Sequence, residues 1–313
     1  MPNNQTRSGH VSVSNLPDDP DFPPVLSTQS DAPDKGDRGD FGELTEDGKE
    51  DVEYPRRPES SFVMKAPDTS NLRNIGEASY GSPPPMAETV HGPDDRVKIE
   101  TTDTFPWRAH ASLLITAKDN SRWIGTAWFV GPRTLITAGH CIYIKDSGVA
   151  GRDGWVKGVN VMPGRNGTEL PYGSTTSTKF RSVTGWTRDG DENYDYGAIL
   201  LTTDLGDRTG WFGYGAYTDA TLNESVGNIS GYPGDKPTGT QWYDSRQIAR
   251  VNNRKVYYDI DTAGGQSGSA AYRVDEGKRY AFAIHAYGGA TVNSGTRINS
   301  PVFDNIKSWK AQS

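Results

Sequence analysis

The chain has 313 residues, enough for one large or two ordinary domains, and a formal net charge of −7. The charge is uneven: residues 1–88 hold 17 acidic and 8 basic residues, whereas residues 89–313 hold 23 acidic and 25 basic ones. The larger part therefore has no electrostatic preference for nucleic acid or an anionic membrane, and no apolar run reaches the roughly 18 residues that span a bilayer.

Residues 1–88 are predicted to be a disordered, acidic, Pro-rich segment. They hold 12 of the 20 prolines and none of the 8 tryptophans, so they offer little apolar surface to offset the entropy of ordering. We expect this segment to be a propeptide. The alternative is a plain disordered tail, which would have the same composition. The first residues lack the apolar core of a signal peptide, which argues against ordinary secretion.

Residues 89–313 are predicted to be all-β. Short apolar or alternating runs such as HASLLITAK, KVYYDID and YAFAIHAYGG are separated by Gly, Pro, Asn and Asp, which is typical of a sandwich or a pair of barrels. One helix is expected at the C-terminus, capped by Ser300 and with Pro301 in its first turn. Phe303 and Ile306 would share its buried face.

The run GTAWFVGPRTLITAGHC predicts a hairpin that ends at His140. A histidine at a strand end is placed to act as a base, because its ordinary pKa is about 6.5. A lone histidine more often satisfies a turn, so this position alone decides nothing.

Asp195 precedes the apolar strand predicted at 198–201 and is placed to orient an imidazole. Its nearest rival, Asp191, lies in a polar loop and is expected to be solvated. The alternative for Asp195 is a turn or strand-capping role.

The run DTAGGQSGS places Ser267 among glycines. Such runs are usually turns, but acyl transfer needs a nucleophilic hydroxyl beside two backbone N–H groups that face the developing oxyanion. We expect the N–H groups of Gly265 and Ser267 to form that oxyanion hole. The order His140, Asp195, Ser267 is one of the chain orders in which a Ser-His-Asp triad occurs.

The segments TAGHC, DYGAILL and GGQSGS resemble the triad signatures of chymotrypsin-fold serine peptidases. Among these peptidases, the chain is similar to the glutamyl endopeptidases of Gram-positive bacteria. The segments that carry this resemblance include PGRNGT, GYPGDKPTGTQW and GTRINSPVFDNIKSW. The resemblance implies two six-stranded β-barrels with the triad between them, His140 as general base, Asp195 as its orienting partner and Ser267 as nucleophile. It also implies cleavage after Glu and, less readily, after Asp.

The resemblance implies two substrate-binding residues, His285 and Thr262. A carboxylate in a pocket needs hydrogen-bond donors or positive charge, which supports a binding role for His285. The alternative is that His285 is a buried core histidine. It also places the mature N-terminus near Thr89, so we expect cleavage of the Glu88–Thr89 bond by the enzyme itself. Close relatives pair the cysteine after the catalytic histidine with another, but here that position is Gly125, which leaves Cys141 without a disulfide partner.

The sequence thus predicts a glutamate-specific serine endopeptidase made as a precursor. No metal or organic cofactor is expected, although calcium binding stays open. Protein and peptide substrates are expected as partners, with no nucleic acid, no membrane and a monomeric state. The resemblance implies an extracellular enzyme; a cytoplasmic one is the alternative. Two other functions stay open: an inactive peptide-binding module on the same fold, and a serine peptidase with a different side-chain preference.

Overall fold

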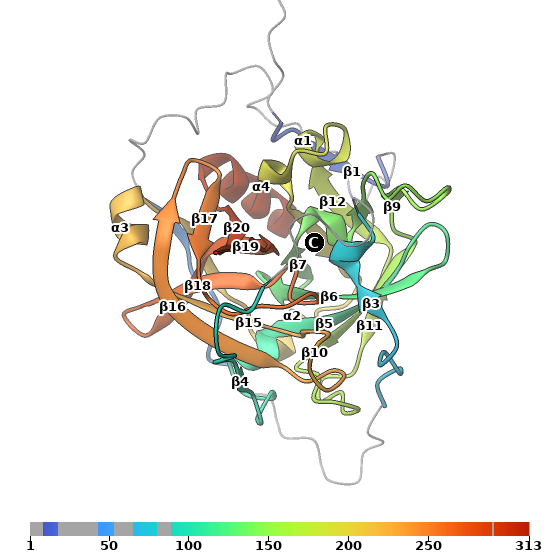
Figure 1. Cartoon of the computed structure of the whole chain (residues 1–313), viewed down its shortest axis with the longest axis horizontal. Helices are drawn as coiled ribbons and strands as arrows, with labels where there is room; N and C mark the ends of the chain where they lie inside the picture. The colour runs from blue at the N-terminus through green and yellow to red at the C-terminus, as the bar shows by residue number, and fades with distance from the viewer. Residues whose placement is uncertain (1–8, 18–42, 53–64, 80–88, 290, 313) are drawn as a thin grey trace, which may run out of the picture.

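Two nine-stranded β-sheets form the body of the protein (Figure 1), in a computed structural model that describes residues 9–17, 43–52, 65–79, 89–289 and 291–312. The first sheet contains β1 (Ser12–Ser14), β3 (Arg73–Asn74), β5 (His110–Thr116), β6 (Arg122–Phe129), β7 (Thr134–Thr137), β10 (Gly158–Pro163), β11 (Thr175–Ser177), β12 (Lys179–Val183) and β13 (Gly197–Leu200). The second contains β2 (Leu44–Glu46), β4 (Val97–Lys98), β14 (Gly213–Ala216), β15 (Val226–Gly231), β16 (Trp242–Val251), β17 (Lys255–Tyr258), β18 (Ala270–Asp275), β19 (Lys278–Tyr287) and β20 (Asn293–Arg297). A separate ribbon pairs β8 (Tyr143–Ile144) with β9 (Gly154–Trp155).

One of the two expected six-stranded barrels is closed. In the second sheet the strands follow the order β18, β15, β16, β17, β20 and β19, and β19 pairs back with β18. The first sheet runs β12, β13, β7, β6, β5, β10, and among the described residues no pairing joins its ends, so the second predicted barrel is not closed. The outer edge of β12 is instead taken by β1, with Ser12 opposite Val183.

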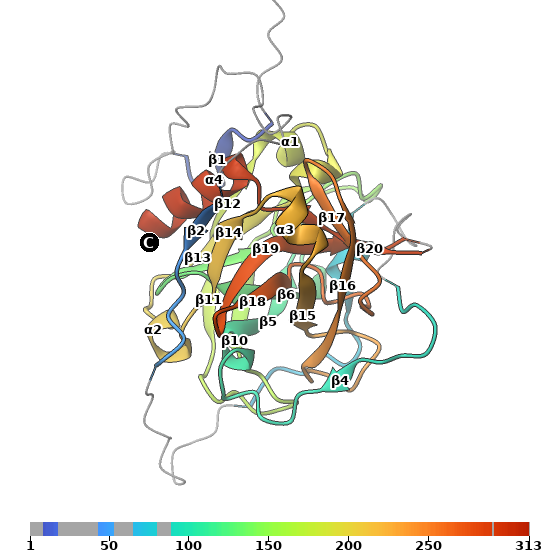
Figure 2. The same ribbon diagram turned by 90° about the vertical axis from the view of Figure 1, so that its left-hand side faces the viewer.

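Three stretches of the front segment are structured, which corrects the expectation of disorder for them. Besides β1 on β12, β2 pairs with β14 and β3 runs parallel to β6. Figure 2 shows β2 beside β14 and near the C-terminal helix. β1 and β2 each add to a sheet edge, and β3 pairs with the part of β6 that β7 leaves unpaired. Their backbone groups therefore find partners without a core of their own.

The C-terminal helix α4 (Ser300–Ala311) confirms the expected closing element. Its cap is one residue earlier than predicted: the side chain of Asn299 accepts a hydrogen bond from the N–H of Val302 at 3.2 Å. The buried face includes Phe303 and Ile306, as expected, and the helix packs on β7 and β14.

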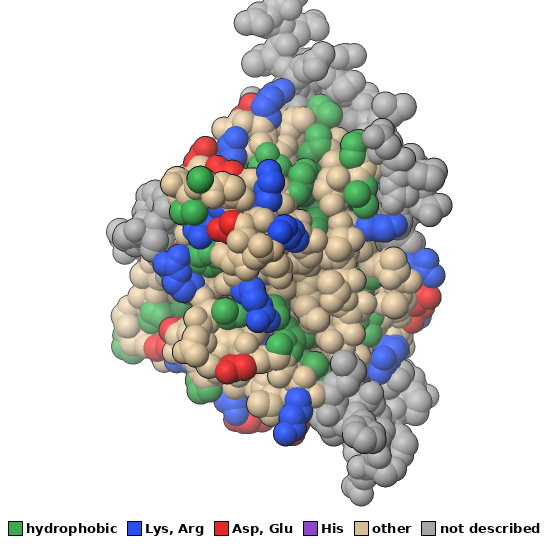
Figure 3. Space-filling view, turned by 90° about the vertical axis from the view of Figure 1, so that its right-hand side faces the viewer, with side chains coloured by type: hydrophobic (Ala, Val, Ile, Leu, Met, Phe, Trp, Pro, Cys, Tyr) green, Lys and Arg blue, Asp and Glu red, His purple; other side chains and the backbone are tan. Residues whose placement is uncertain are grey.

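The remaining helices are single turns: α1 (Thr184–Thr187), α2 (Gly206–Thr209), α3 (Asp219–Asn223), η2 (Ile75–Glu77), η3 (Trp107–Ala109), η4 (Gly139–Cys141) and η5 (Glu192–Tyr194). In the described ranges, no helix combines the length and apolar composition that a membrane crossing requires. Acidic and basic side chains are interspersed over the face shown in Figure 3.

Candidate active site

His140 lies in η4, directly after β7, where the predicted hairpin ends. The hairpin is formed by β6 and β7, with Trp128 opposite Ile136. His140 as a whole is 2 % exposed. The preceding Gly139 is needed because a Cβ there would lie 2.9 Å from a carboxylate oxygen of Asp195. The turn therefore brings imidazole and carboxylate into direct contact.

Asp195 is fully buried between η5 and β13, and both of its carboxylate oxygens bind residue 140. Oδ1 accepts the backbone N–H of His140 at 2.8 Å, and Oδ2 lies 2.7 Å from its Nδ1. Burial acts to raise the pKa of Asp195, but the His140 interaction and hydrogen bonding from Tyr287 outweigh it and lower the pKa. The carboxylate is therefore ionised at neutral pH. Asp191 instead caps η5 by accepting the N–H of Asn193 at 2.9 Å.

The loop that carries Ser267 packs against the same turn. Its carbonyl oxygen accepts the N–H of Thr126 at 3.0 Å and lies 3.6 Å from the thiol of Cys141. Gly268 has φ +90°, and a Cβ there would lie 3.0 Å from the backbone nitrogen of Ala138, so this close approach requires glycine. Ser267 is thus placed beside the strand end that positions His140.

Hydrogen bonds to two carbonyl oxygens set the orientation of the peptide groups in this loop. The carbonyl of Gly264 accepts the N–H of Gly234 at 2.7 Å, and that of Gln266 accepts the N–H of Ser269 at 2.9 Å. Because N–H and C=O of one peptide point in opposite directions, the N–H groups of Gly265 and Ser267 point the other way. These are the two donors that the sequence assigned to the oxyanion hole.

The predicted pocket residue His285 lies on β19 and is joined to the serine loop at two points. Its carbonyl accepts the N–H of Gly268 at 2.7 Å, and its own N–H donates to the carbonyl of Ser269 at 2.9 Å. The ring is fully buried, and its Nδ1 lies 2.8 Å from the hydroxyl of Tyr258. Tyr258 therefore fixes the ring orientation.

Thr262 is also fully buried, and its hydroxyl has no hydrogen-bond partner among the described residues. Its backbone N–H approaches the carbonyl of Thr89 at 3.4 Å. Thr89 is held on both sides by Asn293, which accepts its N–H at 3.0 Å and donates to its carbonyl at 2.6 Å. The chain just after the expected cleavage point thus lies beside Thr262, the second predicted pocket residue. Glu88 lies outside the described residues.

Sequence reasoning missed the supporting residues. Tyr258 orients His285, the hydroxyl of Thr296 donates to the carbonyl of Asp195 at 3.2 Å, and Tyr287 lies beside the carboxylate. Each is an ordinary strand residue, and no local pattern distinguishes it from the other tyrosines and threonines. The position of Gly125 was foreseen correctly, because a Cβ there would lie 3.4 Å from the sulfur of Cys141.

No protein-family model matches the chain. A glutamyl endopeptidase of Bacillus licheniformis is 43% identical over 237 residues, covering 72% of this chain and 71% of the relative. A Bacillus subtilis protein named extracellular metalloprotease is 41% identical over 227 residues, covering 72% and 70%. Among the described residues, no three His, Cys, Asp or Glu side chains form a metal-binding group.

Solved structures give the same fold. A Glu endopeptidase in complex with MPD has a TM-score of 0.62 at 30% identity and covers 71% of this chain and 100% of its own. The protease Anisep from Arthrobacter nicotinovorans has a TM-score of 0.58 at 17% identity, covering 70% and 100%. The fold is therefore that of the chymotrypsin-like serine endopeptidases. By its relatives, the chain belongs to the glutamyl endopeptidase family.

Proposed function

We propose that this serine endopeptidase cleaves peptide bonds after Glu, and less readily after Asp, through a triad of His140, Asp195 and Ser267. The single observation that supports this most is the two-point contact between Asp195 and His140, with the Ser267 loop packed on the same turn. A site that only binds peptides has no need of a buried carboxylate that orients an imidazole.

In the proposed mechanism, Ser267 Oγ attacks the carbonyl carbon of the substrate while His140 takes the hydroxyl proton. Asp195 stabilises the imidazolium, and the N–H groups of Gly265 and Ser267 bind the oxyanion of the tetrahedral intermediate. The C–N bond then breaks as His140 gives the proton to the leaving amine. Water, deprotonated by His140, hydrolyses the acyl-enzyme and releases Ser267.

The preference for Glu is assigned to His285 and Thr262. The ring of His285 is held at Nδ1 by Tyr258, and the hydroxyl of Thr262 is buried and available as a donor. Together they offer polar contacts to a substrate carboxylate, whose burial would otherwise be uncompensated. The names of two relatives, a glutamyl endopeptidase and a Glu endopeptidase, support this assignment.

Residues 1–88 are proposed to be a propeptide that the enzyme removes by cutting the Glu88–Thr89 bond. Support comes from Thr89, whose backbone is held by Asn293 beside Thr262. After the cut, the N–H of Thr89 becomes a positively charged amine close to the carboxylate pocket. We further propose that the mature enzyme is an extracellular monomer acting on proteins, in line with the extracellular name of one relative.

The test is a digest of a protein mixture by the activated enzyme, with Ser267→Ala as the matched variant, followed by mapping of the new termini. We expect cuts after Glu, some after Asp, and a loss of about 10⁶-fold in turnover for the variant. Cuts spread over many residue types would contradict the pocket, and equal cutting by the variant would contradict the nucleophile. N-terminal sequencing of the active form tests the cleavage: a start far from Thr89 would reject it.

A further inference from the structure

Part of the front segment lies directly over the proposed nucleophile. Residues 65–79, here called the cleft segment, run along β6 as β3 and then turn through η2 (Figure 1). A Cβ built on Gly76 would lie 3.7 Å from Ser267 Oγ, which is van der Waals contact. The segment therefore occupies space that a substrate must enter to reach the hydroxyl.

Ile75 is the apolar anchor of the cleft segment, and it is fully buried. Its side chain lies above Gly125 and beside Cys141: a Cβ built on Gly125 would lie 3.2 Å from Cγ2 of Ile75 and 3.4 Å from the sulfur. The missing side chain at position 125 thus makes room for Ile75. Full burial of this isoleucine side chain stabilises the docked state, because it removes apolar surface from water.

Asn74 is the polar anchor on the other side of the nucleophile. Its amide fits against three glycines, and a Cβ on Gly265 would lie 3.0 Å from its Oδ1, while Cβ atoms on Gly234 and Gly264 would overlap it. Gly264 and Gly265 belong to the loop whose N–H groups are proposed to bind the oxyanion. Asn74 therefore covers the oxyanion loop.

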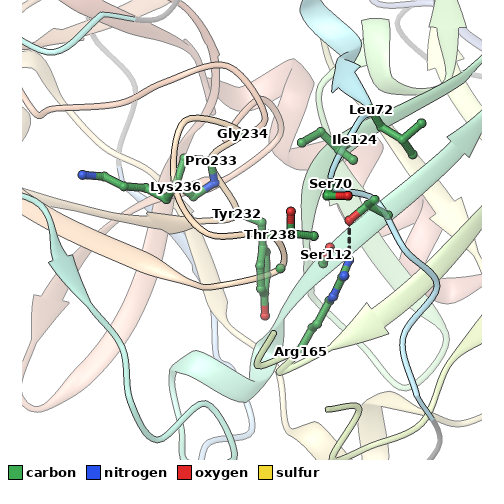
Figure 4. Close-up of a pocket in the computed structure, with 12 residues that line it drawn as sticks. Ser70, Leu72, Ser112, Ile124, Arg165, Tyr232, Pro233, Gly234, Lys236 and Thr238 are labelled. Atoms are coloured by element: carbon green, nitrogen blue, oxygen red, sulfur yellow. Dashed lines mark hydrogen bonds between the residues drawn. The ribbon is translucent and has the colours of Figure 1, made fainter. Parts of the chain in front are cut away.

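Arg165 holds the beginning of the cleft segment. Its side chain is buried and donates to the hydroxyl of Thr69 at 3.1 Å and to the carbonyl of Pro67 at 3.3 Å. Figure 4 shows Arg165 and Tyr232 in the groove where Ser70 and Leu72 also lie. Residues of the segment and of the body together line a small cavity of about 20 Å³ there, about the space of one water molecule. Arg165 thus ties the start of the segment to the body of the protein.

Glu77 follows Gly76 in the chain, and its carboxylate is engaged within the segment itself. Oε1 of Glu77 accepts the amide of Asn74 at 3.3 Å, and Oε2 lies 3.7 Å from Arg73. Its carboxylate is therefore bound by its own segment, which disfavours its use as the substrate glutamate. At its far end, the hydroxyl of Ser79 accepts the backbone N–H of Lys145 at 3.1 Å.

We propose that the surface formed by β6, η4, Arg165 and the glycines around Asn74 is an inhibitor-binding site whose occupant is the chain's own residues 65–79. The anchoring residues Asn74 and Ile75 lie within the segment and bind the body of the protein without residues 80–88, so cutting the Glu88–Thr89 bond leaves the segment bound. Activation then needs a second event, the departure or degradation of residues 65–79. This inference rests on the proposed function, since it assumes that Ser267 is the nucleophile.

The first experiment uses the full chain with Glu88→Gln, which blocks the proposed cut. Labelling of Ser267 by a fluorophosphonate probe is followed in chains shown by gel to be uncut. We expect Ile75→Asp to be labelled about 10-fold faster or more, because a buried, unpaired carboxylate disfavours docking. Lys65→Ala, at an exposed position of the same segment, is the matched control and should label at the parent rate. Equal rates for all three chains would overturn the proposal.

The second experiment adds a synthetic peptide of residues 65–79 to the activated wild-type enzyme, so that no variant has to fold. We expect it to inhibit cleavage of a fluorogenic Glu-containing peptide and to slow the probe, and the peptide with Ile75→Asp to be about 10-fold weaker or more. Failure of both peptides to inhibit an enzyme that reacts with the probe would overturn the inhibitory role. Absence of labelling in every form, the activated enzyme included, would instead reject the proposed function.

Discussion

Asp195→Asn tests the triad through the geometry of one carboxylate. The backbone N–H of His140 is a fixed donor, and it lies 2.8 Å from Oδ1. In the variant, the amide oxygen must face that N–H, because the opposite orientation would place two donors in contact. The NH₂ group then faces Nδ1 of His140 in place of Oδ2, at a site where the original distance is 2.7 Å.

An NH₂ donor at Nδ1 selects the imidazole tautomer that carries its proton on Nε2. That nitrogen then cannot accept the proton of Ser267, and no carboxylate stabilises the imidazolium. We expect kcat/KM to fall about 10⁴-fold at neutral pH, equivalent to about 5.4 kcal/mol of transition-state stabilisation. The packing should survive, because Asn and Asp have nearly the same shape.

The assay is the steady-state cleavage of a fluorogenic Glu-containing peptide by activated enzyme, with far-ultraviolet circular dichroism as a check of folding. Asp191→Asn is the matched control, because this acid caps η5 and binds Asn193. We expect it to change kcat/KM less than about 3-fold, since the amide oxygen of asparagine can still accept the N–H of Asn193 and cap η5. A loss below about 10-fold for Asp195→Asn, or an equal loss for the control, would refute the tautomer argument.

Two further predictions concern the pocket and the core. Tyr258→Phe removes the hydroxyl that lies 2.8 Å from Nδ1 of His285. We expect kcat/KM for Glu substrates to fall about 5-fold, mainly through a higher KM. Unchanged kinetics would show that this contact does not orient the ring. Burial lowers the pKa of His110 from 6.5 to about 4, so its contribution to stability is fully present above pH 6.5 and is lost as the pH falls toward 4. That shift corresponds to about 3 kcal/mol, and His110→Phe in an inactive Ser267→Ala chain should lose this part of the pH dependence in urea unfolding. An equal slope of unfolding free energy against pH in both chains would contradict it.

The sequence by itself was enough to propose the reacting residues. His140 follows the end of an apolar strand, Asp195 precedes another, and Ser267 lies between glycines, one of which has φ +90°. These are local requirements: strand ends follow from runs of apolar residues, and a left-handed backbone favours glycine. Their order along the chain is one in which such triads occur, and the resemblance to the family added to this evidence.

Only the tertiary structure decided what surrounds those residues. Tyr258 and Tyr287 are strand residues whose partners come from distant parts of the chain. The pairing of β1 with the edge of β12 likewise joins segments that are far apart in the sequence. The acidic, Pro-rich composition of residues 1–88 predicted no structure because such a segment cannot bury a core of its own. Three of its stretches are nevertheless ordered, because a finished sheet edge and a groove over Ser267 supply the partners that the segment lacks.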